Sequence, residues 1–270
     1  MIKKIYLIFC ILVISLSANS YQEIIDSKTI RIGVSKYMPP FSKLQDDGTF
    51  EGFEITFAKN LIQRMFNENM NIVFTAVEQS ERIDVLENNK VDMVIAAFTR
   101  NDEREKHVDF SIPYFSINLS MVTPKKLNIK NIGDLQGKNI LTIKNTNSDV
   151  YLQKQGKFNI VYCIDNGDCY KKMRNGEGDA FMHNIVSTAT IPLLDSNYEV
   201  SIGAIGESFF DCVTIQKGNT QLLNKVNEVI ISLAKEDFFS NSYNETFKPF
   251  YRGSVDKKYF ILDDIYKMMF

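Results

Sequence analysis

Short strand-like and helix-like runs alternate along most of this chain of 270 residues, and this alternation is what most restricts its fold. The strand-like runs are rich in β-branched residues, whereas the helix-like runs repeat apolar residues at three- and four-residue spacing. Such alternation is typical of α/β architecture. The strand-like runs are 30–34, 71–77, 91–98, 137–143, 159–162 and 179–182, and the helix-like runs are 53–66, 80–88, 148–155, 168–174 and one that begins at 185.

The N-terminus has the pattern of a secretory signal peptide. Lys3 and Lys4 precede an apolar run over 5–14, and Ala18 and Ser20 are small residues at the two positions that signal peptidase reads. The apolar run is too short to span a membrane, which takes about 20 apolar residues. We therefore expect residues 1–20 to be a signal peptide cleaved near Ser20, and the mature protein to be periplasmic.

The charge and the composition exclude several classes of partner. The formal net charge is −2, and loss of the leader with its two lysines would make the chain slightly more acidic. A mildly acidic chain has no electrostatic attraction for nucleic acid or for an anionic membrane. With two histidines and four cysteines, the chain has little material for a metal centre, so we expect no metal and no cofactor.

Three cysteines follow the leader, namely Cys163, Cys169 and Cys212. In an oxidising compartment the close pair Cys163 and Cys169 is expected to form a disulfide across the turn 164–168. A loop this small contributes roughly 2 kcal/mol of stability in the chain-entropy model. Cys212 is expected to be a buried free thiol.

Arg104 is the main candidate binding residue, because a planar guanidinium matches a carboxylate with two parallel hydrogen bonds. It ends a run that begins at Ala97 and precedes the run 109–114. Together with 52–61, 137–146 and 178–180 in this order, that layout resembles the bacterial extracellular solute-binding proteins of family 3, the periplasmic amino-acid-binding proteins. The resemblance covers about residues 28–250 and is closest to the glutamate/aspartate-type members.

The resemblance implies a two-lobed periplasmic-binding-protein fold of type II, with a ligand cleft between the lobes. Two hinge crossings are expected near 116–122 and 209–213, and the lobes should close on the ligand by hinge motion. Lobe 1 would comprise 21–118 and 211–250, and lobe 2 would comprise 119–210. The C-terminal extension 251–270 is expected to form a strand or helix on lobe 1.

The resemblance also implies a set of ligand-binding residues on both lobes. Ala97, Thr99 and Arg104 occupy the positions that hold the ligand carboxylate. Thr146 and Asn147 stand at a helix start on the other lobe, where backbone N–H groups bind anions. The same segment could simply be a helix N-cap. Arg82 would suit a second ligand carboxylate, and Lys36 could add another cation.

The main departure concerns the amine of an amino-acid ligand. Family members usually hold the α-ammonium with an Asp where this chain has Asn184, and often with another where it has Ser35. An Asn supplies no countercharge, and a desolvated ammonium without one is costly. Either the ligand is a dicarboxylate without an amine, or Glu207 or Asp211 supplies the missing charge.

The resemblance thus predicts a monomeric binding protein that is not an enzyme. It would capture a small carboxylate ligand, an amino acid of acidic or polar type, and deliver it to an inner-membrane ABC permease. Two alternatives remain open at this point. One is a binding protein for an amine-free dicarboxylate, and the other is an enzyme resembling the cyclohexadienyl dehydratases, which need an acid in the cleft to protonate a leaving hydroxyl.

Overall fold

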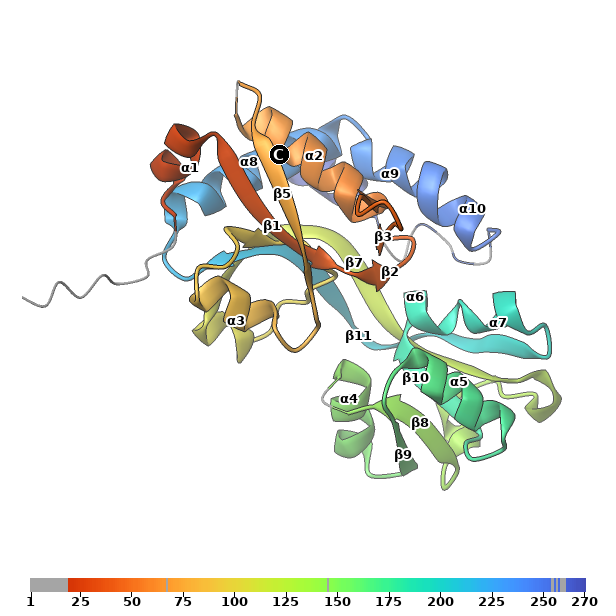
Figure 1. The fold of residues 1–270 in the computed structure, drawn as a ribbon. Helices are drawn as coiled ribbons and strands as arrows, with labels where there is room; N and C mark the ends of the chain where they lie inside the picture. The colour runs from red at the N-terminus through yellow and green to blue at the C-terminus, as the bar shows by residue number, and fades with distance from the viewer. Residues whose placement is uncertain (1–18, 67, 145, 254, 256, 258–260) are drawn as a thin grey trace, which may run out of the picture.

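The computed structural model describes residues 19–270 apart from 67, 145, 254, 256 and 258–260. Figure 1 shows two lobes joined by a pair of long strands. The larger sheet has eight strands in the order β5-β1-β6-β11-β7-β10-β8-β9, so it runs through both lobes. The α/β architecture predicted from the sequence is confirmed.

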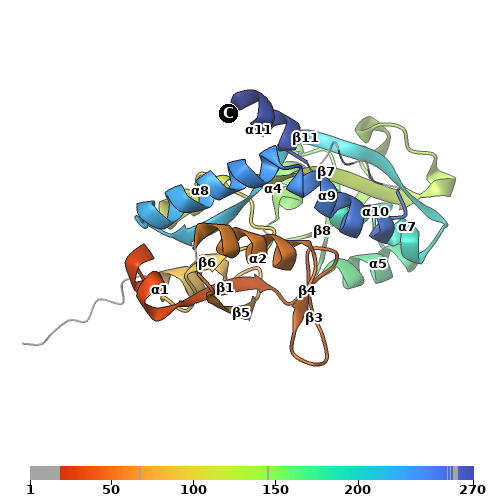
Figure 2. The same ribbon diagram turned by 90° about the horizontal axis from the view of Figure 1, so that it is seen from above.

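Lobe 1 is built on β1 (Thr29–Ser35), which pairs in parallel with β5 (Asn71–Val77) and β6 (Met93–Val94). α2 (Phe53–Met65) and α8 (Thr220–Lys235) lie side by side over one face of this sheet, as the view from above shows (Figure 2). Their apolar stripes share one core with β1. The short helix α3 (Arg82–Glu87) packs in a separate, smaller core with β5 and β6. A small sheet of β2 (Tyr37–Met38), β3 (Ser42–Leu44) and β4 (Phe50–Glu51) precedes α2.

Lobe 2 repeats the same kind of unit. β8 (Asn139–Ile143) pairs in parallel with β9 (Asn159–Cys163) and with β10 (Ala180–Asn184). The helices between and after these strands are α4 (Asn147–Gln155), α5 (Asn166–Arg174), α6 (Ile185–Thr188) and α7 (Ile191–Leu194). The helices predicted over 148–155 and 168–174 are present as α4 and α5, and each begins one or two residues earlier than predicted.

Two long antiparallel strands, β7 (Val108–Pro124) and β11 (Tyr198–Gln216), connect the lobes. Both predicted crossings lie inside them. Their pairing is interrupted by register shifts, including those between Val200 and Phe209 and one between Asp211 and Cys212. Such irregularities bend a strand and redirect its side chains. The lobe boundaries predicted at 118 and 210 fall within these strands and stay a prediction.

The last residues of the chain pack on lobe 1 through helices. α9 (Phe238–Ser242) and α10 (Lys248–Phe250) lead to α11 (Asp263–Met269), which lies against α8. The Tyr266 hydroxyl donates to the carbonyl oxygen of Pro113 at 2.6 Å, and Leu262 and Tyr266 are buried in the lobe 1 core. The expected packing of this extension on lobe 1 is therefore confirmed. No helix within the described residues is long and apolar enough to cross a membrane.

One predicted strand is shorter than expected. The run 91–98 forms a strand only at β6, and the chain then turns at Ala97, whose φ is 45°. The turn is fixed from two sides, because the Ala97 N–H donates to Glu54 at 2.6 Å and its carbonyl accepts from Arg82 at 3.1 Å. The departure from the strand occurs where the chain enters the cleft described below.

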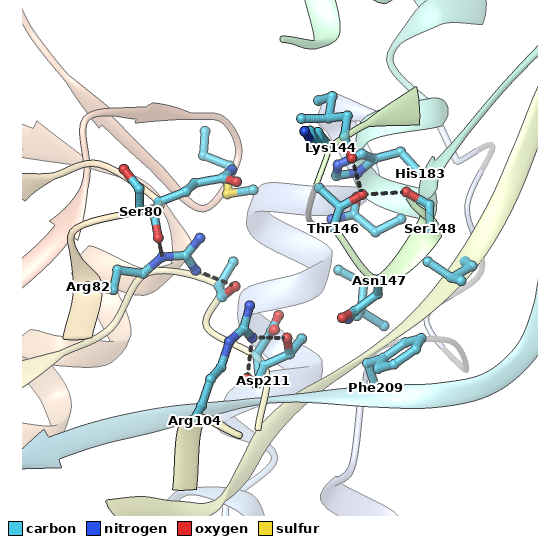
Figure 3. Close-up of a pocket in the computed structure, with 18 residues that line it drawn as sticks. Ser80, Arg82, Arg104, Lys144, Thr146, Asn147, Ser148, His183, Phe209 and Asp211 are labelled. Carbon is cyan, nitrogen blue, oxygen red and sulfur yellow. Dashed lines mark hydrogen bonds between the residues drawn. The ribbon is translucent and has the colours of Figure 1, made fainter. Parts of the chain in front are cut away.

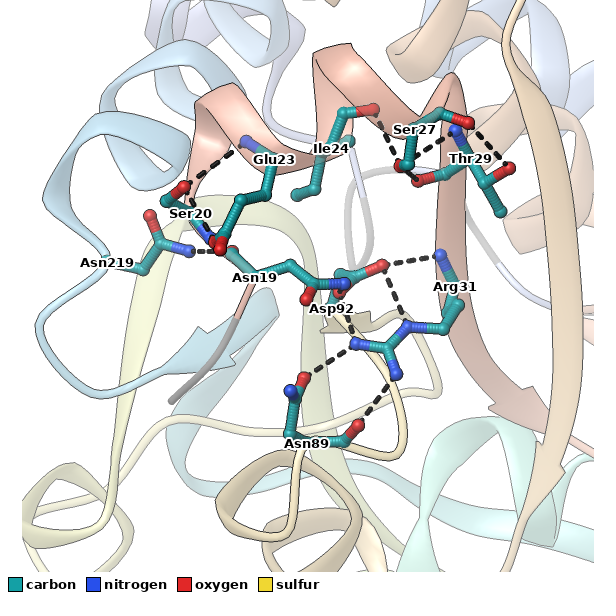
Figure 4. A network of polar contacts seen from close by, with 10 residues as sticks. All are labelled: Asn19, Ser20, Glu23, Ile24, Ser27, Thr29, Arg31, Asn89, Asp92 and Asn219. Carbon is teal, nitrogen blue, oxygen red and sulfur yellow. Dashed lines mark hydrogen bonds and ion pairs between the residues drawn. The ribbon is translucent and has the colours of Figure 1, made fainter. Parts of the chain in front are cut away.

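The predicted signal peptide lies outside the described residues as far as residue 18. The residues that follow are tied to lobe 1 (Figure 4). Asn19 donates to Asp92 at 3.0 Å, and its carbonyl accepts from Asn219 at 3.0 Å. Ser20 and Glu23 form a capping box at the start of α1 (Tyr21–Ser27). Asn19 and Ser20 therefore contribute to the folded domain.

The predicted disulfide is present between Cys163 at the end of β9 and Cys169 in α5. Cys212 is buried as a free thiol in the second crossing strand. Because the bridge closes only a short turn, we expect its removal to cost roughly 2 kcal/mol of stability.

Peptide mapping of the exported protein without reduction tests this pairing. We expect one peptide pair joined through Cys163 and Cys169, with Cys212 modified by an alkylating reagent only after unfolding. Alkylation of both Cys163 and Cys169 in the native exported protein would contradict the assignment.

Candidate ligand-binding cleft

A cleft of about 270 Å³ lies between the two lobes. Figure 3 shows the two guanidinium groups and Asp211 on one wall, and a row of hydroxyl and imidazole groups on the facing wall. The wall of lobe 1 and the crossing strands contribute Met38, Gln79, Ser80, Arg82, Ala97, Thr99, Arg104, Ile117, Leu119, Phe209 and Asp211, and lobe 2 contributes Ile143, Lys144, Thr146, Asn147, Ser148, His183 and Asn184.

Arg104 is placed by a short 3₁₀ helix, Arg104–Lys106, that follows the turn after β6. Its Nη1 donates to both the carbonyl oxygen and the hydroxyl of Thr99, at 2.5 and 2.6 Å. The guanidinium carbon lies 4.6 Å from the centre of the Phe98 ring. This contact and the hydrogen bonds hold a cation in the cleft with further N–H groups available to a ligand.

Arg82 is a second cation on the same wall, but its hydrogen bonds go to the backbone. Its Nε donates to the carbonyl of Gln79 at 3.1 Å, and its Nη1 to the carbonyls of Ala96 and Ala97 at 3.0 and 3.1 Å. Its guanidinium carbon also lies over the Phe98 ring, at 4.7 Å. Burial, with the nearby Arg104, lowers the pKa of Arg82 to about 10, so it stays charged at neutral pH.

A buried carboxyl group supports the turn at Ala97 from below. Glu54, in α2, accepts hydrogen bonds from the Ala97 N–H at 2.6 Å and from the Tyr114 hydroxyl at 2.5 Å. Burial raises the pKa of Glu54 to about 7, against the opposing effect of these hydrogen bonds. Glu54 does not line the cleft, so its role is to fix the backbone that does.

Asp211 is the acidic residue of the cleft wall. It sits in β11, where a single bridge pairs it with Thr99. Its side chain is fully buried, and neither carboxyl oxygen has a hydrogen-bond partner among the described residues. Burial raises the pKa of Asp211 to about 8, and the charge of Glu54 adds to this, while Arg82 and Arg104 oppose it.

The facing wall in lobe 2 is formed by the start of α4 and the end of β10. Thr146 caps α4, and its hydroxyl also contacts the hydroxyl of Ser148 at 2.8 Å. The Asn184 side-chain oxygen accepts from the N–H of Ser187 at 2.9 Å. That oxygen already accepts one hydrogen bond and is uncharged, so Asn184 supplies no countercharge to a ligand ammonium. Burial lowers the pKa of His183 to about 4, which makes its imidazole neutral at neutral pH.

The structure brings most of the predicted site residues together. Ala97, Thr99, Arg82, Arg104, Thr146, Asn147 and Asn184 all line the cleft. Lys36 and Glu207 are exposed and do not line it. Lys144, Ser148, His183 and Phe209 were not predicted. Neighbouring residues of a strand point to opposite faces, so the prediction of Asn184 gave no indication of His183, which lines the cleft at the end of β10. The positions of Phe209 and Asp211 depend on the irregular register of β11.

The chain belongs to the bacterial extracellular solute-binding proteins, family 3, whose family model matches residues 30–249. It is similar to the L-cystine-binding protein TcyJ of Escherichia coli K12, with 28% identity over 77% of this chain and 78% of that protein. The L-glutamate/L-aspartate-binding protein of Pseudomonas aeruginosa is 30% identical over 61% of this chain and 58% of that protein.

Among solved structures, the solute receptor for L-cysteine of Neisseria gonorrhoeae superimposes with a TM-score of 0.78. The match has 29% identity and covers 89% of this chain and 98% of that one. The two-lobed fold of periplasmic amino-acid-binding proteins, expected from the sequence, is thereby confirmed.

Proposed function

We propose that this protein captures a free amino acid of acidic or polar type in the cleft between its lobes and delivers it to an ABC transporter. Arg104 would hold the α-carboxylate together with Thr99 and the backbone of Ala97. The start of α4, at Thr146 and Asn147, would meet the same carboxylate when the lobes close. We infer a monomeric protein acting in the periplasm, with a permease of the inner membrane as its partner.

The observation that carries this proposal is the guanidinium of Arg104 fixed inside the cleft. Among the described residues of the walls, Arg82 and Lys144 add two more cations, against one carboxyl group at Asp211. A cleft with this balance favours a ligand with net negative charge. The names of the relatives, which bind glutamate, aspartate, cystine or cysteine, support a small amino acid.

The two alternatives differ in what Asp211 would do. A dicarboxylate without an amine would need Asp211 to stay protonated, because an ionised carboxyl would repel it. A dehydratase would need Asp211 to give its proton to a leaving hydroxyl. We favour binding without chemical conversion because the named relatives are binding proteins and a solute receptor. We favour an amine-bearing ligand because the named relatives bind L-cystine, L-glutamate or L-aspartate, and L-cysteine.

A thermal-shift screen of the mature protein tests the proposed function. The panel should hold the common L-amino acids, L-cystine, and amine-free acids such as glutarate and succinate. A ligand at 100 times its dissociation constant adds about 2.7 kcal/mol of stability by mass action. For a chain of this size that corresponds to a rise in Tm of roughly 5 to 10 °C. If no member of the panel at millimolar concentration shifted the Tm, the proposed function would be wrong.

A further inference from the structure

The acceptors that line the cleft beside Arg104 each accept a hydrogen bond already, and none of them is charged, so none can supply a countercharge to a ligand ammonium. The carbonyl and the hydroxyl of Thr99 both accept from Arg104. The carbonyl of Ala97 accepts from Arg82, and the side-chain oxygen of Asn184 caps α6. An α-ammonium lies two bonds from its carboxylate, so its acceptor must lie next to the group that holds that carboxylate.

Asp211 meets this requirement by position. It is the only carboxyl group among the described residues that line the cleft. The bridge to Thr99 brings it beside the residue that Arg104 contacts. Its two oxygens are buried without a hydrogen-bond partner among the described residues. A buried polar group in this state is costly and calls for a partner.

We propose that Asp211 receives the α-ammonium group of the ligand and is thereby the residue that selects amino acids over amine-free acids. This inference rests on the proposed function, because it assumes a carboxylate held at Arg104. Asp211 is fully covered in this structure, so side chains around it have to shift before the ammonium reaches it. In this arrangement the ligand carboxylate pairs with Arg104 and the ligand ammonium pairs with Asp211, so each charged group of the ligand has an opposite charge beside it.

The elements that pack around Asp211 contribute several charged or titratable groups. Arg82 of α3 and Arg104 lie on its cleft side, and Glu54 of α2 and Tyr114 of β7 lie in the core below. Cys212 follows it in β11. Lys144 and His183 stand on the opposite wall, and His183 remains uncharged at neutral pH because burial lowers its pKa to about 4.

Binding of an ammonium at Asp211 should therefore release a proton. With its pKa raised to about 8 by burial, Asp211 is mostly protonated in the empty cleft at neutral pH. An ammonium favours the ionised form, so the affinity for an amino acid rises with pH until about pH 8. From pH 6 to 7.5 the rise should be roughly 20-fold by proton linkage. An amine-free acid should show no such rise, because it gains nothing from ionised Asp211.

The test uses calorimetric titrations with matched ligand pairs at pH 6 and 7.5. The pairs are L-glutamate with glutarate and L-cysteine with 3-mercaptopropionate, each amine-free acid lacking only the α-ammonium. For the wild type we expect the amino acid of at least one pair to bind more tightly than its amine-free partner, with the pH dependence given above. Asp211→Asn should weaken amino-acid binding at least tenfold and remove the pH dependence.

Two controls show whether the effects come from Asp211 itself: the variant Glu54→Gln and the folding stability of Asp211→Asn. Glu54→Gln retains an oxygen for the Ala97 N–H and the Tyr114 hydroxyl but cannot ionise. Because burial raises the pKa of Glu54 to about 7, this variant shows whether Glu54 causes the pH dependence. We expect the dependence to persist in this variant. Asp211→Asn should fold at least as stably as wild type at pH 7.5, because the unfolded wild type has released a proton that the folded protein retains.

The outcomes separate the two proposals. Binding of amino acids by Asp211→Asn within threefold of wild type, with an unchanged pH dependence, would overturn the role of Asp211. Equal binding of amine-free partners by wild type would overturn it too, and the solute-binding function would still stand. If none of these ligands bound and the wider thermal-shift panel also gave no response, both proposals would fail.

Discussion

Arg104→Ala should abolish binding of whichever carboxylate ligand the screen identifies. In the closed cleft the ligand carboxylate would lose the cation beside Thr99, and Arg82 cannot replace it because its guanidinium is bound to the backbone carbonyls of Gln79, Ala96 and Ala97. Truncating one partner of a buried charge pair costs roughly 2 to 5 kcal/mol, which corresponds to a loss of affinity of about 30-fold or more. Isothermal titration calorimetry of the variant and the wild type measures this loss directly.

Arg100→Ala is the matched control. Arg100 lies four residues earlier, outside the cleft, in an exposed ion pair with Glu105. Exposed ion pairs contribute about 1 kcal/mol or less, and this one has no access to the ligand. We therefore expect affinity near that of the wild type. Binding by Arg104→Ala within threefold of the wild type would show that the ligand carboxylate is held elsewhere.

Gly52→Ala should cause a large loss of stability, roughly 3 kcal/mol, from backbone strain combined with overpacking. Gly52 precedes α2 with φ of 125°, and a Cβ built there would lie 2.4 Å from the carbonyl oxygen of Phe41. The segment at Pro40 and Phe41 has to approach this closely because it caps α2. The carbonyl oxygens of Pro40 and Phe41 accept hydrogen bonds from the N–H groups of Phe53 and Glu54. Urea unfolding of the purified variant measures the change.

Gly48→Ala separates steric conflict from backbone strain alone. Gly48 also has a positive φ, 84°, but nothing lies within 4 Å of the Cβ position. Its substitution should cost about 1 kcal/mol, the usual penalty for a left-handed conformation. Equal losses from the two substitutions would mean that the contact between Gly52 and Phe41 relaxes without cost.

Much of the cleft could be predicted from the sequence, because the residues proposed to hold the ligand carboxylate are close together in the sequence. The family resemblance predicted Arg104, Thr99 and Ala97, and these three residues lie within eight positions of one another. Gly52 stands directly before the helix-like run 53–66 in the sequence. The reason for a glycine there is a backbone contact with a segment about ten residues earlier, which only the structure reveals.

Other parts of the cleft could not be predicted, for physical reasons. The strand expected over 91–98 ends early because Glu54 and Arg82 bind the backbone of Ala97, and neither contact is local in sequence. Asp211 was one of two possible sources of negative charge. A choice between Asp211 and Glu207 depends on which residues of β11 face the cleft, and several register shifts along this strand decide that. The structure places Asp211 in the cleft wall and Glu207 at the surface.

The central claim is that the ligand is an amino acid held between the lobes by Arg104. A crystal structure of the protein with the ligand found in the screen tests it most directly. We predict the ligand carboxylate within hydrogen-bond distance of the Arg104 guanidinium and of the Thr146 and Asn147 backbone, with its ammonium on Asp211. Ligand density outside this cleft, or in the cleft with its carboxylate away from Arg104, would contradict the account.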